Sequence, residues 1–251
     1  SNMLISEYAK LLSDRLDIAS FDDISLNGVQ IESPDRCLKK VAFAVDACLA
    51  TIEKAVDEKA DILVVHHGLF WGHPIAISAT HYKRVKTAID GNLTLYACHI
   101  PLDAHPVYGN NAQMAIRLGM REFDPFGVWR GKYIGVKGKL PFPMTVKEIA
   151  LLLNFDPLSC HMIQNKEKVE TVGIISGGAG SDVIDAISEG LDLFITGDLG
   201  HENYHIALES GIDVLAGGHY RSEVFGVEAL MRMSQKELGL ETLFIPMETG
   251  L

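Results

Sequence analysis

The sequence predicts an α/β protein made of two similar lobes with mostly parallel sheets. Short apolar runs of strand length alternate with longer stretches whose apolar residues have helical spacing. The same succession of strand, helix and strand occurs in both halves of the chain. Polar residues, many of them histidine, follow directly after several of the apolar runs. A chain of 251 residues can bury one large core or two modest ones.

The first half opens with helical spacing over residues 4–16, and Asn27-Gly28 marks a turn before a short strand at 29–31. Alternation of strands and helices then begins, which is typical of a parallel sheet. The predicted strands of this part are 40–45, 61–66 and 93–97, and the predicted helices are 46–60 and 82–89.

The middle of the chain, residues 124–168, is broken by prolines and is predicted to connect the lobes, with a strand at 133–140 and a helix at 145–153 that Thr145 caps. Beyond it the first pattern returns. We therefore predict one lobe over 3–124 and a second over 125–251, with 223–251 as candidates to pack back on the first. The strands predicted here are 172–176, 191–196, 212–216 and 242–246, and the helices are 181–189 and 223–239.

Composition excludes several classes of function. A formal net charge of -11 argues against general binding of nucleic acids or anionic membranes, because both need a basic surface. Four cysteines without CxxC spacing indicate neither a disulfide scaffold nor a thiolate zinc site, which favours a cytoplasmic location. No apolar run approaches the roughly 18 residues that span a bilayer, so no association with a membrane is expected.

The stretch Asp61-Ile-Leu-Val-Val-His66-His67-Gly68 is the centre of the functional argument. Its apolar residues predict a strand buried on both faces of a parallel sheet. Ligands bind beyond the carboxyl ends of such strands, where His66 and His67 lie. Adjacent side chains on a strand face opposite ways, so both imidazoles can serve one site only if the strand stops there, and Gly68 permits that turn.

Four polar clusters end apolar strands in this way, and the ends of parallel strands converge on one edge of a sheet. His219 and Glu223 are four residues apart, a spacing that suits two ligands on one helix face. Imidazoles and carboxylates without thiolates suit Zn, Fe, Mn, Co or Ni. Three imidazoles and two carboxylates are too many ligands for one tetrahedral ion and suit a pair of ions about 3.5 to 4 Å apart. The clusters are His66 with His67; His99 with Asp103 and His105; Asp198 with His201 and His205; and His219 with Glu223.

Other patterns have two interpretations each. His201-Glu-Asn-Tyr-His205 matches the HExxH pattern of zinc proteases, but it follows a strand and turn at once, whereas that pattern needs an established helix. Gly178, in the run from Ser176 to Ser181, could offer a backbone amide to a phosphate, or the run could be a tight turn. Arg221 could bind an anionic substrate or form a surface ion pair.

Taken in order, these motifs resemble the GTP cyclohydrolase I type 2 homologue family, also called Nif-three-like. Each motif is weak alone, whereas the ordered set is specific and covers nearly the whole chain. The motifs are Asn27-Gly28-Val29-Gln30, His66-His67-Gly68, His99-Ile-Pro-Leu-Asp103, the glycines at 177–180, Gly197-Asp198 and Gly218-His219-Tyr-Arg-Ser-Glu223.

This resemblance implies a dinuclear metal site in the cleft between two α/β lobes, and a ring-shaped homohexamer. Asp103 or Glu223 would bridge the two ions, while His99 and His201 would lie beside the ligands as proton donors or acceptors. The ligands that the resemblance implies are His66, His67, Asp103, His219 and Glu223.

The function expected from these observations is metal-dependent hydrolysis of a nucleotide or another small phosphate-containing substrate, because two metal ions activate water and polarise a carbonyl or phosphoryl oxygen. Opening of a purine imidazole ring would be one such reaction. The alternatives are a metal-binding ring protein without turnover, which stores or delivers metal or binds a partner, and an HExxH metalloprotease.

Overall fold

A computed structural model describes residues 2–251 of the chain, which form two compact units. The first contains the chain up to Leu102 together with Gly226–Met247, and the second contains Asp103–Phe225 with Glu248–Leu251. Met114 and Ala115 of the helix at 110–117, with Leu118 directly after it, belong to the core of the second unit. Within the described residues, no helix is both long and apolar enough to cross a membrane.

The first unit contains a five-stranded sheet in the order β1-β4-β3-β2-β11. Its elements are α1 (Ile5–Leu16), the 3-10 helix η1 (Ile18–Ser20), β1 (Gly28–Ile31), β2 (Lys40–Asp46), α2 (Leu49–Asp57), β3 (Ile62–His67), α3 (Ala79–Asp90), β4 (Thr94–Ala97), the start of α4 (Ile100–Ala104), most of α10 (Val224–Lys236) and β11 (Glu241–Phe244).

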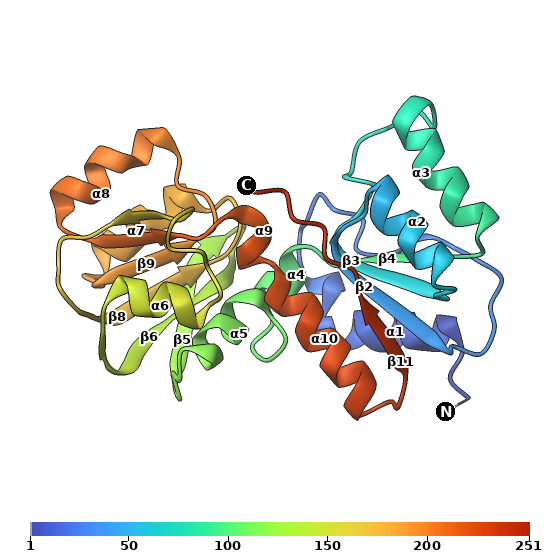
Figure 1. The fold of residues 1–251 in the computed structure, drawn as a ribbon, viewed down its shortest axis with the longest axis horizontal. Helices are drawn as coiled ribbons and strands as arrows, with labels where there is room; N and C mark the ends of the chain where they lie inside the picture. The colour runs from blue at the N-terminus through green and yellow to red at the C-terminus, as the bar shows by residue number, and fades with distance from the viewer. Residues whose placement is uncertain (1) are drawn as a thin grey trace. The chain divides into compact units, whose positions relative to one another are not determined.

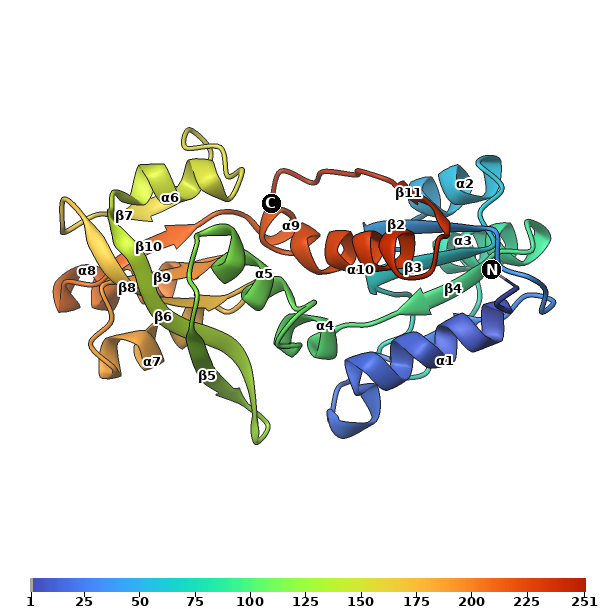
Figure 2. The same ribbon diagram turned by 90° about the horizontal axis from the view of Figure 1, so that it is seen from below.

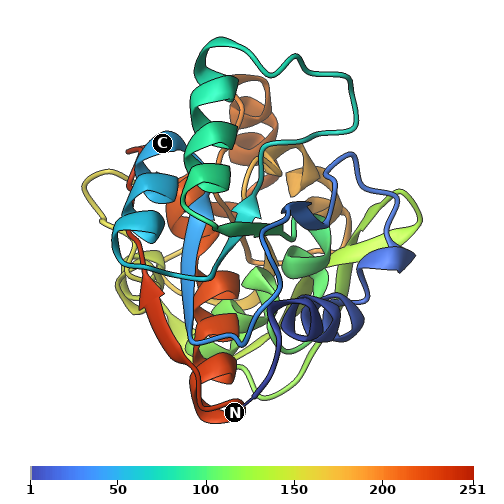
Figure 3. The same cartoon turned by 90° about the vertical axis from the view of Figure 1, so that its right-hand side faces the viewer.

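Strands β2, β3, β4 and β11 are parallel, and β1 joins β4 antiparallel. Figure 1 shows β11, from the end of the chain, beside β2 from its beginning. The middle strands are buried on both faces, as their apolar runs predict. Helices α2 and α3 lie on one side of these strands and α1 and α10 on the other (Figure 3).

The second unit contains a six-stranded sheet in the order β5-β6-β8-β9-β10-β7. Its elements are α5 (Asn110–Arg117), β5 (Phe123–Trp129), β6 (Lys132–Met144), α6 (Val146–Leu152), β7 (His161–Ile163), β8 (Val169–Ile175), the 3-10 helix η2 (Gly180–Asp182), α7 (Val183–Ser188), β9 (Leu193–Thr196), the 3-10 helix η3 (His201–Asn203), α8 (Tyr204–Ser210), β10 (Asp213–Ala216) and α9 (His219–Ser222).

Strands β8, β9 and β10 form a parallel centre, and β5, β6 and β7 add to it by antiparallel pairing. Figure 2 shows α6 and α7 on opposite sides of this sheet. The prolines of the middle segment suggested a connection between lobes, but residues 123–163 instead supply strands and a helix of the second unit. The predicted cap of α6 is confirmed, since the Thr145 hydroxyl accepts a hydrogen bond from the Glu148 amide at 3.1 Å.

An α/β fold with two sheets and parallel central strands is therefore confirmed. The closing helix predicted over 223–239 corresponds to α10, but His219 and Glu223 do not share one continuous helix, because α9 ends at Ser222 and α10 begins at Val224. Glu223 lies between them with φ -117°, outside the helical range. This break affects one of the candidate metal ligands.

Candidate metal centre

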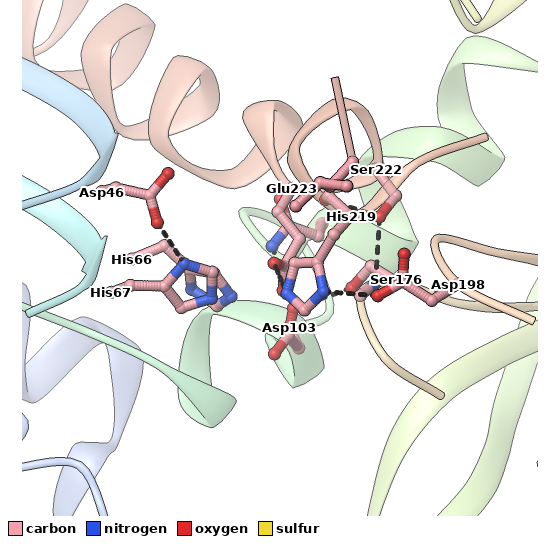
Figure 4. Close-up of polar contacts among 12 residues, drawn as sticks. Asp46, His66, His67, Asp103, Ser176, Asp198, His219, Ser222 and Glu223 are labelled. Atoms are coloured by element: carbon pink, nitrogen blue, oxygen red, sulfur yellow. Dashed lines mark hydrogen bonds and ion pairs between the residues drawn. The ribbon is translucent and has the colours of Figure 1, made fainter. Parts of the chain in front are cut away.

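His66 and His67 end strand β3, and each imidazole is anchored through Nδ1. His66 is fully buried, and its Nδ1 lies 2.9 Å from the backbone oxygen of Cys98. His67 is 19% exposed, and its Nδ1 lies 2.7 Å from Oδ1 of Asp46, the residue paired with it in register at the end of β2 (Figure 4). Both oxygens accept hydrogen bonds, so each Nδ1 carries the hydrogen and the ring lone pair is on Nε2.

His99 follows β4 and is anchored in the same way. Its Nδ1 lies 3.1 Å from Oδ1 of Asp23, whose side chain is almost fully buried. Burial alone would raise the pKa of Asp23, but the hydrogen bond and positive charge of His99 and the Ile100 amide outweigh it and lower that pKa to about 2. Asp23 is therefore an ionised acceptor, and its interaction favours the Nδ1-protonated ring of His99.

These three imidazoles form one cluster within the first unit. Ring centroids lie 4.6 Å apart for His66 and His67, 5.2 Å for His66 and His99, and 5.6 Å for His67 and His99. One nitrogen from each ring lies within 4.8 Å of the others. Trp71 packs edge-on against His99, with ring centroids 4.9 Å apart, and gives the cluster an apolar wall. Three converging imidazoles are a donor set that Zn, Fe, Cu or Ni accepts.

The second unit gathers two buried carboxylates. Asp103 is 6% exposed and Glu223 is 2% exposed, and an oxygen of each lies within 4.8 Å of the other. Asp103 accepts hydrogen bonds from Nδ2 of Asn110 at 2.9 Å and from the hydroxyl of Ser176 at 2.8 Å. Two buried carboxylates so close together repel each other, and a cation between them would compensate both charges.

His219 joins this acidic group by both ring nitrogens. Its Nε2 lies 2.7 Å from Oε1 of Glu223, and its Nδ1 lies 2.7 Å from Oδ2 of Asp198 (Figure 4). The hydrogen bond to Glu223 is the main cause that raises the pKa of His219 to about 9, with Asp198 adding to it against the opposing effect of burial. Because a histidine ligand must be neutral, a metal ion at this position would displace a proton.

The turn after β8 holds the acidic group together. Ser176 binds Asp103, and the next amide, that of Gly177, donates to the hydroxyl of Ser222 at 2.9 Å. Gly177 has φ +70°, and a Cβ there would lie 2.9 Å from Oε2 of Glu223. A tight turn that requires glycine is therefore present at this position.

Several residues singled out in the sequence lie elsewhere in the second unit. The HExxH segment is divided between η3 and α8, and its histidines, His201 and His205, are exposed, so it lacks the single helix that the protease pattern needs. His105 stabilises a turn, since its Nδ1 accepts from the amides of Val107 and Tyr108 at 3.1 and 2.9 Å. The described residues that could hold a metal ion in groups include neither His201 nor His205 nor His105.

Asp198 and Arg221 each have a defined partner in the structure. Oδ2 of Asp198 lies 2.7 Å from Nδ1 of His219 and orients that ring, while η3 begins after Gly200 without a side-chain cap. Arg221 forms an ion pair with Glu248, which is the second of its two interpretations from the sequence.

Sequence reasoning missed the carboxylates that orient the imidazoles. Asp46 ends β2 as His67 ends β3, so alignment of neighbouring parallel strands could have identified it. Asp23 lies 76 residues before its partner His99 in a segment without periodicity, and no local pattern indicates it. Trp71 was also missed, because an aromatic residue in a loop has no spacing to interpret.

Comparison with known proteins adds information on ancestry. A family model described as Duf34/NIF3 (NGG1p interacting factor 3) matches residues 3–250. A protein of Deinococcus radiodurans named GTP cyclohydrolase 1 type 2 homolog is 40% identical over 247 residues, which are 98% of this chain and 94% of that protein. One of the same name from Archaeoglobus fulgidus is 41% identical over 251 residues, which are 99% and 100% of the two chains.

Two solved structures are also similar to this chain over nearly its whole length. The crystal structure of TTHA1606 from Thermus thermophilus is similar with a TM-score of 0.87 and 38% identity, covering 99% of this chain and 100% of that one. The structure of protein ybgI, described as of unknown function, has a TM-score of 0.88 and 31% identity with the same coverage. The similarity in both cases extends over the whole fold.

Proposed function

Because this chain belongs to the Duf34/NIF3 family, we propose that it is a metal-dependent hydrolase that acts on a nucleotide or another small phosphate-containing substrate. The observation that carries the proposal is the cluster of His66, His67 and His99, in which one nitrogen of each ring lies within 4.8 Å of the others and each Nδ1 lies at an oxygen that accepts its hydrogen. Metal-binding histidines typically have such an acceptor on the second nitrogen.

Two divalent ions, of Zn, Fe, Mn, Co or Ni, are proposed as the cofactors. When bound, such ions lower the pKa of water and polarise a carbonyl or phosphoryl oxygen. Asp103 and Glu223 are the candidate bridging residues, because both are buried and close together. The proposed ligands are His66, His67, Asp103, His219 and Glu223.

The remaining proposed roles belong to the chain's own acids, bases and donors. Glu223 and His99 are the proposed catalytic residues that accept or donate a proton, with His201, on the exposed helix η3, as a third candidate. Arg221 would have to exchange its partner Glu248 for a substrate phosphate. The Gly178 amide is the candidate for a second contact to that phosphate.

The name shared by the relatives makes hydrolytic opening of the purine imidazole ring of GTP the first reaction to test, and phosphoester cleavage the second. We expect metal-depleted protein to be inactive and activity to return with one or more of Mn, Fe, Zn and Ni. A protein that binds its ions fully and turns over none of these substrates would be a metal-binding ring protein without this activity.

Metal analysis combined with anomalous diffraction from untreated protein tests the site most directly, because it determines ion identity, number and ligands together. Two ions held by the five proposed ligands would support the proposal, whereas ions bound to other residues would contradict it. Light scattering measures the mass of the assembly, for which six copies are proposed.

A further inference from the structure

The segment from Asp23 to Gln30 contacts both of the turns that carry the imidazoles of the first unit. The sequence indicated a turn and a short strand there, with Asn27-Gly28-Val29-Gln30 among the motifs of the resemblance, and the proposed function assigns the segment no role. Three of its four polar side chains, those of Asp23, Asn27 and Gln30, each bond to a clustered histidine or to a residue within two positions of one.

Asp23 and Asn27 hold the segment that begins at His99. Oδ2 of Asp23 accepts a hydrogen bond from the Ile100 amide at 2.9 Å and one from Nδ2 of Asn27 at 3.1 Å, while its Oδ1 faces the His99 ring. Oδ1 of Asn27 in turn accepts from the His99 amide at 2.9 Å. Ring and backbone of His99 are thus both tied to this segment.

Gln30 holds the turn that follows His67. Its Oε1 accepts from the Leu69 amide at 2.7 Å, and its Nε2 donates to the Leu26 carbonyl at 2.9 Å. The side chain lies directly against Gly68, where a Cβ would be 2.3 Å from Oε1 of Gln30. The glycine after the two histidines therefore permits this close approach, whereas its φ lies outside the left-handed region and does not itself require glycine.

We propose that the segment Asp23–Gln30 positions the imidazole cluster, and that Asp23 is a positioning residue that keeps the hydrogen of His99 on Nδ1 and its lone pair on Nε2. The lone pair of His99 is then presented as those of His66 and His67 are. A lone pair on Nε2 is what either an ion or a proton requires, so the inference deepens the proposed function and rests on it for its consequence.

The substitution Asp23→Asn separates this role from simple loss of packing. Two donors, the Ile100 amide and Asn27, face Oδ2 and only the Ser25 amide, at 3.2 Å, donates to Oδ1, so an asparagine would place its carbonyl oxygen at the Oδ2 position and turn its NH2 group toward His99. The His99 ring would then have to accept at Nδ1 and carry its hydrogen on Nε2. Asp22→Asn is the matched control, because it removes the same charge one residue away from an exposed side chain.

Two-bond proton–nitrogen correlation spectra of the metal-depleted protein report the tautomer directly, with the His99 signals assigned by their loss in His99→Gln. We expect the Nδ1–H form in the wild type and in Asp22→Asn, and the Nε2–H form in Asp23→Asn. An Nε2–H form in the wild type overturns the proposal, and so does an unchanged tautomer in a folded Asp23→Asn protein. The wild-type spectrum decides the first point even if the variant does not fold.

Calorimetric titration with Zn²⁺ tests the consequence. An N–H group directed at the cluster repels a cation whether the ring binds the ion or a water molecule on it, so we expect Asp23→Asn to bind Zn²⁺ about 10- to 100-fold more weakly than Asp22→Asn. Equal affinities with a changed tautomer would overturn the functional part of the proposal. A wild-type protein that binds no Zn²⁺ or other divalent ion would instead refute the proposed function and leave the tautomer result standing.

Discussion

The two units of this protein share a frame but differ at the ends of its strands. In the first, β2, β3 and β4 lie side by side and parallel, with β1 antiparallel on β4. In the second, β8, β9 and β10 have the same order and direction, with β7 antiparallel on β10. Each frame is built in the same chain order, which supports the internal duplication suggested by the sequence.

The side chains that follow equivalent strands have diverged. Strand β3 ends in His66 and His67, whereas β9 is followed by Gly197 and Asp198. A histidine follows β4 and β10 alike, but its carboxylate partner has a different origin: Asp23, outside the repeated frame, orients His99, whereas Asp198, at the end of the neighbouring strand, orients His219. The shared strand arrangement thus determines the positions of the functional side chains, at the carboxyl ends of the strands. The residue types at these positions determine the chemistry.

Removal of a carboxylate from the second unit should have the largest effect. We expect Glu223→Ala to lose at least one bound ion and any hydrolase activity, because Glu223 is buried beside Asp103 and His219. Metal content after desalting measures this, with Glu209→Ala, an exposed glutamate of α8, as the control. Retention of two ions by Glu223→Ala would show that the second unit does not supply this ligand.

Two glycines with positive φ in the second unit differ in their surroundings: Gly177 is in the turn that holds the acidic group, and Gly131 is in the hairpin between β5 and β6. Gly177→Ala combines φ +70° with a Cβ 2.9 Å from Glu223, whereas Gly131→Ala combines φ +79° with nothing within 4 Å. We expect losses in the free energy of unfolding of about 3 kcal/mol for Gly177→Ala and about 1 kcal/mol for Gly131→Ala. Urea unfolding measures both, and equal losses would mean that Glu223 yields without cost.

The aspartates that orient one histidine in each unit allow a direct comparison. We expect Asp46→Asn and Asp198→Asn each to weaken binding of Zn²⁺ about 10- to 100-fold, because each loses the charged acceptor of a histidine Nδ1. Calorimetric titration measures the change, and Asp90→Asn, at an exposed ion pair of α3, is the control. If only one of the two variants differs from this control, the aspartate changed in the other variant does not orient a histidine that binds the ion.

Much of the frame could be predicted because its strands are continuous apolar runs, and such runs are recognisable without long-range information. Two of the strands that add to the frame, β6 and β11, were also predicted as strands, but their pairing partners could not be predicted. β11 pairs with β2 across about two hundred residues of chain, and β5 and β6 contain prolines and exposed residues that suit an outer hairpin as well as a linker. Pairing of this kind is decided by tertiary contact and leaves no local signal.

The candidate site also contains residues that could be predicted from the sequence and residues that could not. His66 and His67 could be predicted because they directly follow the apolar run that forms a strand. The residues that orient them could be found only where they end a neighbouring strand, as Asp46 does, and not where they come from an irregular segment, as Asp23 does. The geometry of the acidic group likewise depends on Ser176 and Ser222, whose hydroxyls are ordinary in sequence.

The smallest effect we predict concerns the first helix of each frame. In the first unit Thr51 bonds to the Cys48 amide at the start of α2, whereas in the second Asp182 precedes α7 half-buried. Burial, followed by the charge of Asp185, raises the pKa of Asp182 to about 6. A carboxyl whose pKa is raised by folding favours the folded state while it is protonated, and this contribution is lost as pH rises through about 6.

Asp182→Asn should therefore stabilise the protein above pH 6 and have little effect below pH 4. The rise in pKa from 3.8 to about 6 corresponds to about 3 kcal/mol at most, and solvent screening of a half-buried group reduces the expected gain to about 1 kcal/mol. Urea unfolding at pH 4 and pH 8 measures the difference, and Asp185→Asn, which removes the neighbouring charge, should give a smaller gain. A stabilisation independent of pH would show that the helix in the second unit begins without a cost from this charge, as α2 does in the first.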